Sequence, residues 1–560
     1  MSKVLERKRF FSDSFGKKEY KRLFLLGALF GALLFVLIYG VEILNPTYIG
    51  WIFCGDNDLK QHYAGWCHYR MSPWHFPIGL IDTLSYPTSI SVIYTDSIPL
   101  MAFICKLFSP VLPQNFQYFG VVGLLSFALS GGTSAVLLKR FIGNPWMCIL
   151  LSSLFTVNFP IMQRMFYHTA LSAHWLIFAA FILWAYDNYS VNCLKSCIYW
   201  GILGALAVSI HPYYIPMLGM ILVADRICFF VFSDKKIIQA LVPVLSYCAT
   251  AVLVLWIFGG FYGSSTAVGF GLGTFGANFN TFINPINYGV ILPDMGLQNY
   301  FQYEGCGYIG AGLLALSIFV DVMLIVRRKE HNFTKNAKVH GIVLAGLFVC
   351  SFAVATLPKL SIGVIDIGQI PYPEPIYRLF SIFRSNGRFI WPAMYILMMA
   401  IVVYAYRYLK SNPKIMIAVF AAVILIQGVD LSKQIGEKRE YYYAHHDMST
   451  IWDEVPKLSM MAAGKKHFVF LYDENDINMD TSFYAYEHGM TLSNFYFARD
   501  INDEVLKTIN AYMGELSKNM VRDDSLYIMK TDYYMSNKNF IDSLDAEICR
   551  YEDHIFMIAD

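Results

Sequence analysis

Charged side chains are scarce in this sequence. Only 15% of the 560 residues are Asp, Glu, Lys or Arg, whereas 56% are hydrophobic. Soluble domains carry about 25% charged residues, so the scarcity excludes an ordinary soluble protein and indicates a membrane protein. The 43 basic and 41 acidic side chains nearly balance. That balance gives no reason to expect a nucleic-acid partner.

Several motifs that mark common classes of protein are also missing. The eleven cysteines form no CxxC pair and no His/Cys spacing typical of a zinc site. No internal repeat is evident, and no strand, glycine-rich turn and helix follow one another as a nucleotide site requires. Cys54 and Cys67 could form a disulfide if their loop is extracytoplasmic, and two free thiols are the commoner alternative.

What the sequence has instead is a series of long apolar runs. A helix needs about 20 apolar residues to cross a hydrocarbon core. The first run, 23–41, is longer than a signal core and no small-residue cleavage site follows it, so we interpret it as a retained span. The others predicted lie at about 117–137, 145–160, 170–186, 195–210, 213–231, 238–258, 307–326, 340–357, 389–407 and 413–428. The sequence therefore predicts a polytopic α-helical membrane protein with about eleven transmembrane helices.

The distribution of lysine and arginine predicts the orientation. Residues 1–22 are strongly basic, which favours a cytoplasmic amino terminus. The transmembrane domain then covers 23–428, with a long first external loop at 42–116. Segment 98–112 is too short and too polar to span, so we expect it to be interfacial or re-entrant. Every predicted inside connection carries lysine or arginine, in agreement with this count.

The last 130 or so residues are much more polar than the rest. Strand-like runs occur at 467–472 and 525–530, and a helix-like stretch lies between them at 503–518. This mixture predicts a small extracytoplasmic α/β domain over 429–560.

Carboxylates lie at both ends of the first external loop. Asp56 and Asp58 follow the first span, and Asp96 lies where the chain returns towards the bilayer. Such groups could accept a proton from a hydroxyl or hold a divalent cation, Mg²⁺ or Mn²⁺, at Asp56 and Asp58. For Asp96, capping of the following helix is an equal alternative.

Further polar residues gather where other predicted spans meet the outer boundary. The candidates for substrate binding are His62, His168, His174, Tyr303 and Glu304. His168 and His174 are six residues apart, which is not the same-face spacing of a helical zinc pair. Interfacial histidines with one hydrogen bond each are the plainer interpretation. Glu304 at the threshold of a span is costly unless it is paired or solvated.

Arginines on the outer side run against the usual charge bias. Arg384 and Arg388 precede a late span, and Arg70 lies in the first loop. The guanidinium group binds phosphate through two parallel hydrogen bonds, so these three are candidates for holding a phosphate at the membrane surface. Anionic lipid head groups are the alternative partner.

These stretches together resemble the GT-C superfamily of integral-membrane glycosyltransferases, in particular bacterial multi-span members. The resemblance rests on the order of "DLKQHYAGW", "FPIGL", "YTDSIPL", "HTALSAHWL", "YEGCGYIG" and "NGRFIWP", and runs from about residue 20 to 430. It implies transfer of a sugar, with inversion, from a polyprenyl-phosphate carrier. It also implies that the aspartate after the first span acts as base or metal ligand. That residue is Asp58, with Asp56 an additional neighbour.

The function predicted is therefore an inverting glycosyltransferase of the bacterial inner membrane. Asp58 would act as base, Arg384 and Arg388 with help from Arg70 would stabilise the leaving phosphate, and Asp96 and Glu304 would position the sugar or a cation. Its partners would be a polyprenyl-phosphate sugar, a glycan acceptor on the outer face, and membrane lipids. The alternative is a transporter or flippase of lipid-linked glycans, which usually places ionisable groups near the bilayer midplane.

Overall fold

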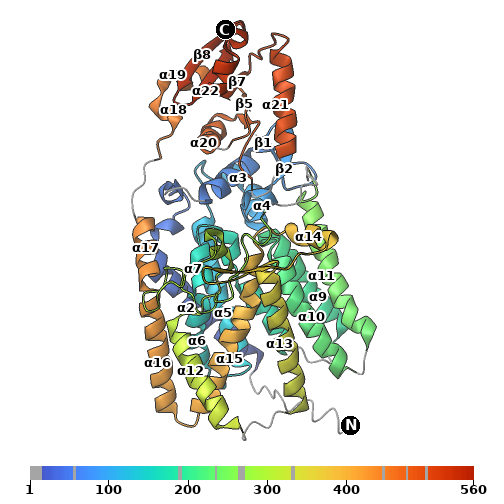
Figure 1. Ribbon diagram of the computed structural model, residues 1–560, viewed down its shortest axis with the longest axis vertical. Coiled ribbons are helices and arrows are strands. Elements are labelled where there is room, and N and C mark those ends of the chain that lie inside the picture. The colour runs from blue at the N-terminus through green and yellow to red at the C-terminus, as the bar shows by residue number, and fades with distance from the viewer. Residues whose placement is uncertain are drawn as a thin grey trace.

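The computed structural model describes most of the chain. The described residues are 16–53, 58–186, 192–233, 236–262, 271–328, 334–443, 448–474, 477–497 and 502–560. They form a helical bundle, a layer of loops beyond one end of the bundle, which we call the external layer, and a carboxy-terminal α/β domain on top of that layer (Figure 1).

Nine helices within the described residues are long and apolar enough to cross a membrane. They are α2 (Lys17–Tyr39), α5 (Phe119–Lys139), α8 with its preceding turn η5 (Thr169–Tyr186), α9 (Cys193–Ile210), α10 (Tyr214–Phe232), α11 (Ile237–Ile257), α13 (Lys335–Thr356), α15 with its preceding turn η8 (Asn386–Leu409) and α16 (Pro413–Asp430). The predicted class, a multi-pass helical membrane protein, is confirmed.

Two of the eleven predicted spans are shorter helices. They are α6 (Pro145–Thr156), of 12 residues, and α12 (Ala311–Val326), of 16 residues. At about 1.5 Å per residue, neither reaches the roughly 30 Å thickness of a hydrocarbon core. The predicted span 145–160 stops early because Asn158 caps a separate short helix, α7 (Phe159–Arg164), which Pro160 helps to start.

The surface of α2 shows how the bundle meets lipid and how it packs. Leu25, Leu29 and Leu33 form a row spaced by four residues, and each is about half exposed or more. Gly27 and Gly31 lie on the face towards α5, where a Cβ atom on Gly31 would lie 2.2 Å from the carbonyl oxygen of Phe127. This small-xxx-small spacing lets two backbones approach closely, as in other membrane helix pairs.

The external layer is built mainly from the first loop. Its elements are η1 (Glu42–Leu44), η2 (Gly50–Phe53), α3 (Leu59–Met71), β1 (Leu80–Ser85), β2 (Thr88–Ser91), η3 (Val92–Thr95), α4 (Pro99–Leu107) and η4 (Ser109–Val111). Strands β1 and β2 pair as an antiparallel hairpin. Helix α4 has nine residues, about 14 Å of helix, and therefore does not span, as predicted. Cys67 is a buried free thiol, and Cys54 lies outside the described residues.

Later connections add elements at the same end of the bundle. They are η6 (Tyr300–Gly305), the hairpin β3 (Lys359–Ile362) and β4 (Ile365–Gln369), and α14 (Glu374–Ser381). Helix α17 (Ser432–Tyr443) follows α16 after Leu431 and contacts α2.

The carboxy-terminal domain contains a five-stranded mixed sheet in the order β6-β5-β7-β9-β8. The elements are α18 (Ile451–Glu454), α19 (Pro456–Ala462), β5 (His467–Phe470), α20 (Asn478–His488), β6 (Thr491–Leu492), α21 (Asn502–Leu516), β7 (Ser525–Lys530), α22 (Thr531–Ser536), α23 (Lys538–Ile541), β8 (Ala546–Tyr551) and β9 (His554–Ala559). Strands β6, β5 and β7 are parallel, whereas β7, β9 and β8 are antiparallel. The predicted α/β character is confirmed, with the expected strands and helix close to their predicted positions.

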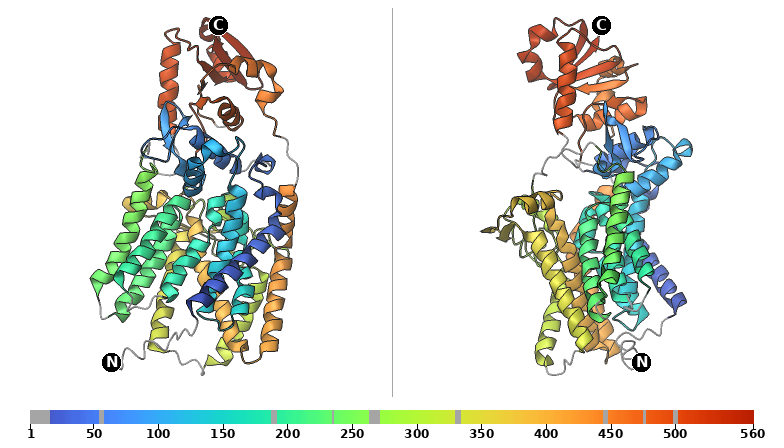
Figure 2. Two further views of the ribbon diagram at one scale, coloured as in Figure 1. Left: turned by 180° about the vertical axis from the view of Figure 1, so that it is seen from behind. Right: turned by 90° about the vertical axis from the view of Figure 1, so that its right-hand side faces the viewer.

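The domain sits on the first external loop rather than directly on the helices (Figure 2). Helix α20 packs on α3, and β6 lies beside β1. His68 bonds to the carbonyl oxygen of Ser482 at 2.9 Å, and the Tyr86 N–H donates to the carbonyl of Leu492 at 2.8 Å. The first loop therefore lies between the carboxy-terminal domain and the helical bundle.

Candidate active site

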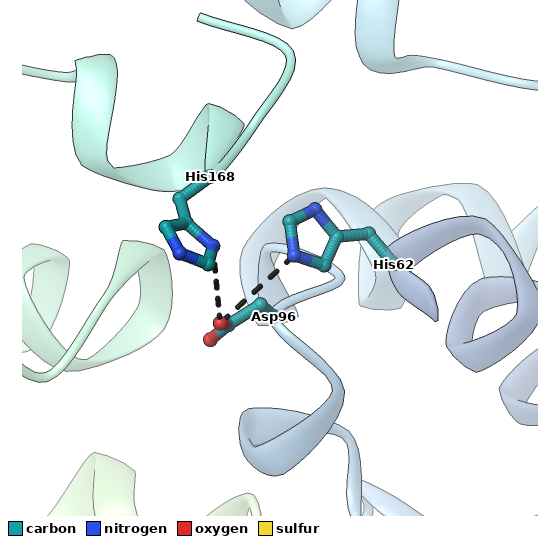
Figure 3. Close-up of side chains that lie close together, drawn as sticks. All are labelled: His62, Asp96 and His168. Carbon is teal, nitrogen blue, oxygen red and sulfur yellow. Dashed lines mark ion pairs between the residues drawn. The ribbon is translucent and has the colours of Figure 1, made fainter. Parts of the chain in front are cut away.

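Two aspartates and three histidines from distant parts of the chain meet in the external layer. The Asp58 Oδ2 atom lies 3.2 Å from His168 Nε2, and Asp96 Oδ1 lies 3.3 Å from His211 Nε2. Asp96 Oδ2 is 3.9 Å from both His62 Nε2 and His168 Nδ1. Figure 3 shows the rings of His62 and His168 turned towards the Asp96 carboxylate. We call these five residues the Asp/His cluster.

The backbone around Asp96 is strained, and tight packing holds it in place. Asp96 and Ile98 have φ of 52° and 54°, a region costly for non-glycine residues, above all β-branched ones. Ser97 Oγ donates to the carbonyl oxygen of His62 at 2.7 Å. A Cβ atom on Gly65 would lie only 2.4 Å from Thr95 Oγ1, so glycine is required for α3 to approach this turn. Strain of this kind collects at functional sites.

The alternative role for Asp96, capping the next helix, is wrong. The residue at the N-cap of α4 is Ile98, and no side chain caps that helix. The Asp96 carboxylate instead points to the histidines, because its left-handed backbone turns the side chain towards His211 and His62.

Neighbouring charged groups separate the protonation behaviour of the two buried aspartates. Burial, together with the negative charges of Asp96 and Glu304, raises the pKa of Asp58 to about 6. Burial alone would also raise the pKa of Asp96, but His211, followed by His62 and His168, holds it well below its usual range. Asp96 is therefore a permanent anion, whereas Asp58 titrates near neutral pH and is suited to proton transfer.

His62 and His168 are neutral at physiological pH. Burial lowers the pKa of His62 to about 4. Burial, together with Arg388 and Arg164, holds the pKa of His168 well below its usual range. Neutral imidazole is the form that binds metal ions. Nδ1 and Nε2 of His62 and Nδ1 of His168 are buried and have no hydrogen-bond partner within the described residues.

These observations fit a cation site at His62, Asp96 and His168. One ligand atom from each of the three lies within 4.8 Å of the others. Two imidazoles and one carboxylate favour a transition-metal ion such as Mn²⁺ or Zn²⁺ over Mg²⁺. The predicted pair for a cation was Asp56 and Asp58. Asp56 lies outside the described residues, and Asp58 contacts His168 instead.

Beside the cluster lies a closed ion triad, which we call the Arg/Glu triad. Glu304 in η6 accepts from Arg164 Nη1 in α7 at 3.1 Å and from Arg388 Nε in η8 at 2.7 Å. Its carboxylate also lies 2.7 Å from Arg164 Nη2 as an ion pair. All three side chains are nearly fully buried. Burial alone would raise the pKa of Glu304, but the two guanidinium groups hold it well below its usual range. The triad therefore carries a net charge of about +1, next to Asp58 and His168.

Two aromatic rings border the triad. Arg388 lies 4.7 Å from the centre of the Tyr213 ring, and Arg164 lies 5.8 Å from that of Tyr303. The Tyr213 hydroxyl accepts from the backbone N–H of Ser385 at 2.8 Å, which ties η8 to the start of α10. Arg384 is exposed and lies 5.1 Å from the Phe275 ring.

The structure thus brings together most of the candidate residues, namely Asp58, His62, Asp96, His168, Tyr303, Glu304, Arg384 and Arg388. Two others lie elsewhere. The terminal nitrogens of Arg70 donate to the carbonyl oxygens of Ser109, Leu112, Pro113 and Gln114, so this guanidinium holds a loop rather than a phosphate. His174 is buried between helices, where Nδ1 bonds to the Tyr395 hydroxyl and the ring lies against Trp391.

The structure also adds residues that were not among the candidates predicted from the sequence. Arg164 and His211 were each noticeable in the sequence as polar groups at helix ends, but nothing in the sequence linked them to Glu304 or Asp96. Tyr213, two residues after His211, gave no signal.

Most of the chain matches a family of known proteins. Residues 28–432 match the family described as Domain of unknown function (DUF6311), and residues 457–559 match the DUF6311 C-terminal domain. The chain belongs to the DUF6311 family. No curated protein matches the sequence of this DUF6311 protein.

Two solved structures are similar to the DUF6311 chain over nearly its whole length. One is ArnT from Cupriavidus metallidurans bound to undecaprenyl phosphate, with 9% identity, a TM-score of 0.48, and coverage of 97% of this chain and 98% of that chain. The other is the archaeal oligosaccharyltransferase AglB from Archaeoglobus fulgidus, in complex with an inhibitory peptide and a dolichol-phosphate. It shows 11% identity, a TM-score of 0.44, and coverage of 95% and 72%. Similarity at this level does not transfer an activity.

Proposed function

We propose that this protein is a glycosyltransferase that moves a sugar, with inversion, from a polyprenyl-phosphate carrier to a glycan acceptor on the outer face of the bacterial inner membrane. The observation that carries the proposal is the pairing of Asp58, whose pKa is raised to about 6, with a buried triad of net positive charge at the end of a membrane bundle. The resemblance in sequence to GT-C enzymes supports it.

Asp58 is the general base of the proposed reaction. Its carboxylate removes the proton from an acceptor hydroxyl, whose oxygen then bonds to the anomeric carbon of the donor sugar. The bond from that carbon to the phosphate oxygen breaks, and the carrier leaves as polyprenyl phosphate. A base with a pKa near the working pH is efficient, because it is both available and basic enough.

The arginines supply the positive charge that the leaving phosphate requires. Arg388 gives only its Nε–H to Glu304, and its terminal nitrogens are the donors we assign to the phosphate, with Arg384 beside them. A cation held by His62, Asp96 and His168 would act as a Lewis acid on the sugar or phosphate oxygens. A polyprenyl carrier lies in the membrane, so a site at the ends of the helices is within its reach. With the amino terminus in the cytoplasm, that site faces the outer side of the membrane.

Transport of lipid-linked glycans is the second candidate, and the placement of charges favours transfer. The Asp/His cluster and the Arg/Glu triad lie at one end of the bundle. An ion pair does lie inside a span, between Asp225 and Arg226 of α10. Trp200 also donates to Asp225, at 3.1 Å, so the pair is locked into the packing of two helices.

The test is the isosteric substitution Asp58→Asn, which removes the base and keeps the shape. We expect transfer from a purified polyprenyl-phosphate sugar to fall by about 100-fold to 10,000-fold. Asp82→Asn is the matched control, because Asp82 lies in the same loop but bonds to His75 and Ser89. Transfer by Asp58→Asn at the rate of the control would remove Asp58 from the role of base.

A further inference from the structure

The carboxy-terminal domain reaches into the candidate site through the segment that follows β6. Residues 493–497 follow β6 outside any helix or strand. The side chain of Gln61 donates from Nε2 to the backbone carbonyl of Tyr496 at 3.1 Å. Gln61 stands one turn after Asp58 and next to His62. The contact therefore fixes a residue of the soluble domain beside the proposed base.

The Tyr496 side chain lies near groups that the proposed reaction uses. Its phenol interacts electrostatically with Arg384, Asp58 and Asp96. Burial raises the pKa of Tyr496, and Asp58 raises it further, so the phenol keeps its proton. Because arginine has donors only, the phenol oxygen is the atom that can accept from Arg384. The O–H hydrogen of Tyr496 is then the group that can be offered to a substrate oxygen.

The segment is held firmly, because the domain is docked on the first loop on several sides. The Tyr86 ring stacks on His467 with 4.3 Å between ring centres, and Phe53 lies 4.6 Å from Phe483. Tyr486 donates to the carbonyl oxygen of Gln114 at 2.9 Å. Phe495 and Phe497, on either side of Tyr496, are buried. Tyr496, which is only partly buried, is therefore presented on a rigid support.

The direction of approach indicates which substrate Tyr496 meets. A polyprenyl phosphate must arrive from the bilayer, where Arg388 and Glu304 stand at the ends of helices. The domain that carries Tyr496 lies on the opposite side of the first loop, away from the bundle (Figure 1). A residue that enters from this side faces the substrate that arrives from water. Under the proposed function, that substrate is the acceptor glycan.

We propose that Tyr496 forms the acceptor subsite and determines acceptor specificity, a role that rests on the proposed glycosyl transfer. The ring supplies a flat apolar face for the carbon-bound hydrogens of an acceptor sugar, and the phenol O–H donates to one of its oxygens. Asp58 and Tyr496 then hold the acceptor between them. The family's two regions, the membrane domain and its carboxy-terminal domain, are parts of one active site.

Substitution of Tyr496 tests this assignment. We expect Tyr496→Ala to raise the KM for acceptor by 10-fold or more and to leave the KM for the polyprenyl-phosphate donor within about twofold. Tyr496→Phe, which keeps the ring, should show a smaller rise in the same constant. Tyr534→Ala, a tyrosine of the same domain that bonds to Asp542, is the matched control. If the donor KM changed instead, Tyr496 would act together with Arg384 in binding the donor phosphate, and the proposal would be overturned.

A binding measurement keeps the inference separate from the proposed reaction. The probe is a fluorescently labelled oligosaccharide, prepared from the surface polysaccharide of the source bacterium, in equilibrium dialysis against the full-length Asp58→Asn protein. We expect binding that is at least 10-fold weaker in the double variant with Tyr496→Ala. Equal binding by both proteins, or by neither, overturns the acceptor subsite. Weakened binding without any transfer by the wild type supports the subsite and counts against the proposed reaction alone.

Discussion

Helix α3 carries two histidines that look alike by burial but differ in their bonds. His62 and His68 are both completely buried, and burial lowers the pKa of each to about 4. His68 bonds through Nδ1 to Thr83 Oγ1 at 2.8 Å and through Nε2 to the Ser482 carbonyl at 2.9 Å. His62 has no hydrogen-bond partner at either ring nitrogen within the described residues.

The difference separates a structural end of α3 from a functional one. At the carboxy-terminal end, His68 and Arg70 bond to other loops and join the carboxy-terminal domain to the membrane domain. At the amino-terminal end, Asp58 and His62 face a cluster whose contacts are loose. A buried polar atom without a partner costs about 1–3 kcal/mol, so its persistence points to a ligand. On α3, unfilled bonding capacity rather than burial therefore distinguishes His62 from His68.

The Arg/Glu triad is the strongest test of this distinction, because it lies near the site and yet its charges are paired with one another. We expect Glu304→Gln to lower the free energy of unfolding by about 3–5 kcal/mol, since two buried guanidinium groups lose their counter-charge. Titration with SDS in mixed micelles measures this loss. The control is Glu374→Gln, which breaks an exposed pair with Arg378 and should cost less than about 1 kcal/mol. Equal stability of the two variants would show that the triad is not a structural element.

The two histidines of α3 should respond in opposite ways. We expect His68→Ala to lower the free energy of unfolding by about 2–4 kcal/mol, because it leaves a cavity and two buried groups without partners. We expect His62→Ala to leave stability within about 1 kcal/mol and to reduce transfer by about 10-fold to 100-fold, as loss of a metal ligand or its support does.

Parallel measurement of SDS unfolding and of sugar transfer on the two variants separates these outcomes. Addition of Mn²⁺ or Zn²⁺ should raise the unfolding midpoint of the wild type but not that of His62→Ala. If His62→Ala were as unstable as His68→Ala, His62 would be a core residue and the contrast between the two ends of α3 would disappear.

The sequence predicted the helices well because lipid imposes a simple requirement on composition. All eleven apolar runs are helical, and the two short ones, at α6 and α12, differ in length rather than in kind. The placement of Asp58, Asp96, Glu304 and Arg388 at the ends of spans could also be predicted, since polar residues at span boundaries are visible in a linear pattern.

The sequence could not show which ends of the membrane spans lie next to one another in the fold. His168 and Asp58 are far apart in sequence and become neighbours only through the packing of the helix bundle. Arg70 has a side chain that could bind phosphate, and only the fold shows that its terminal nitrogens already donate to backbone carbonyl oxygens. Tyr496 is one of 38 tyrosines, and nothing nearby in the sequence singles it out. The left-handed backbone at Asp96 is likewise imposed by tertiary packing, through Gly65 and Ser97.

The smallest expected effect is a dependence of domain docking on pH. Burial depresses the pKa of folded His68 to about 4, whereas an unfolded histidine titrates near 6.5. The stability that neutral His68 contributes is therefore complete above pH 6.5 and is lost as the pH falls towards 4. Between pH 7.5 and 5.5 the loss amounts to about 1.4 kcal/mol. Hydrogen exchange of the α20 amides, corrected for intrinsic rates, reports the opening of this contact.

His68→Gln isolates the contribution of His68 from those of the other histidines. The variant should exchange faster than the wild type at pH 7.5, and the difference between the two proteins should shrink at pH 5.5. His62 and His168 titrate equally in both proteins, so their effects cancel in the difference. A constant difference across this range would mean that His68 does not hold the carboxy-terminal domain through its neutral ring, and that the structural end of α3 is set by Arg70 and the aromatic contacts alone.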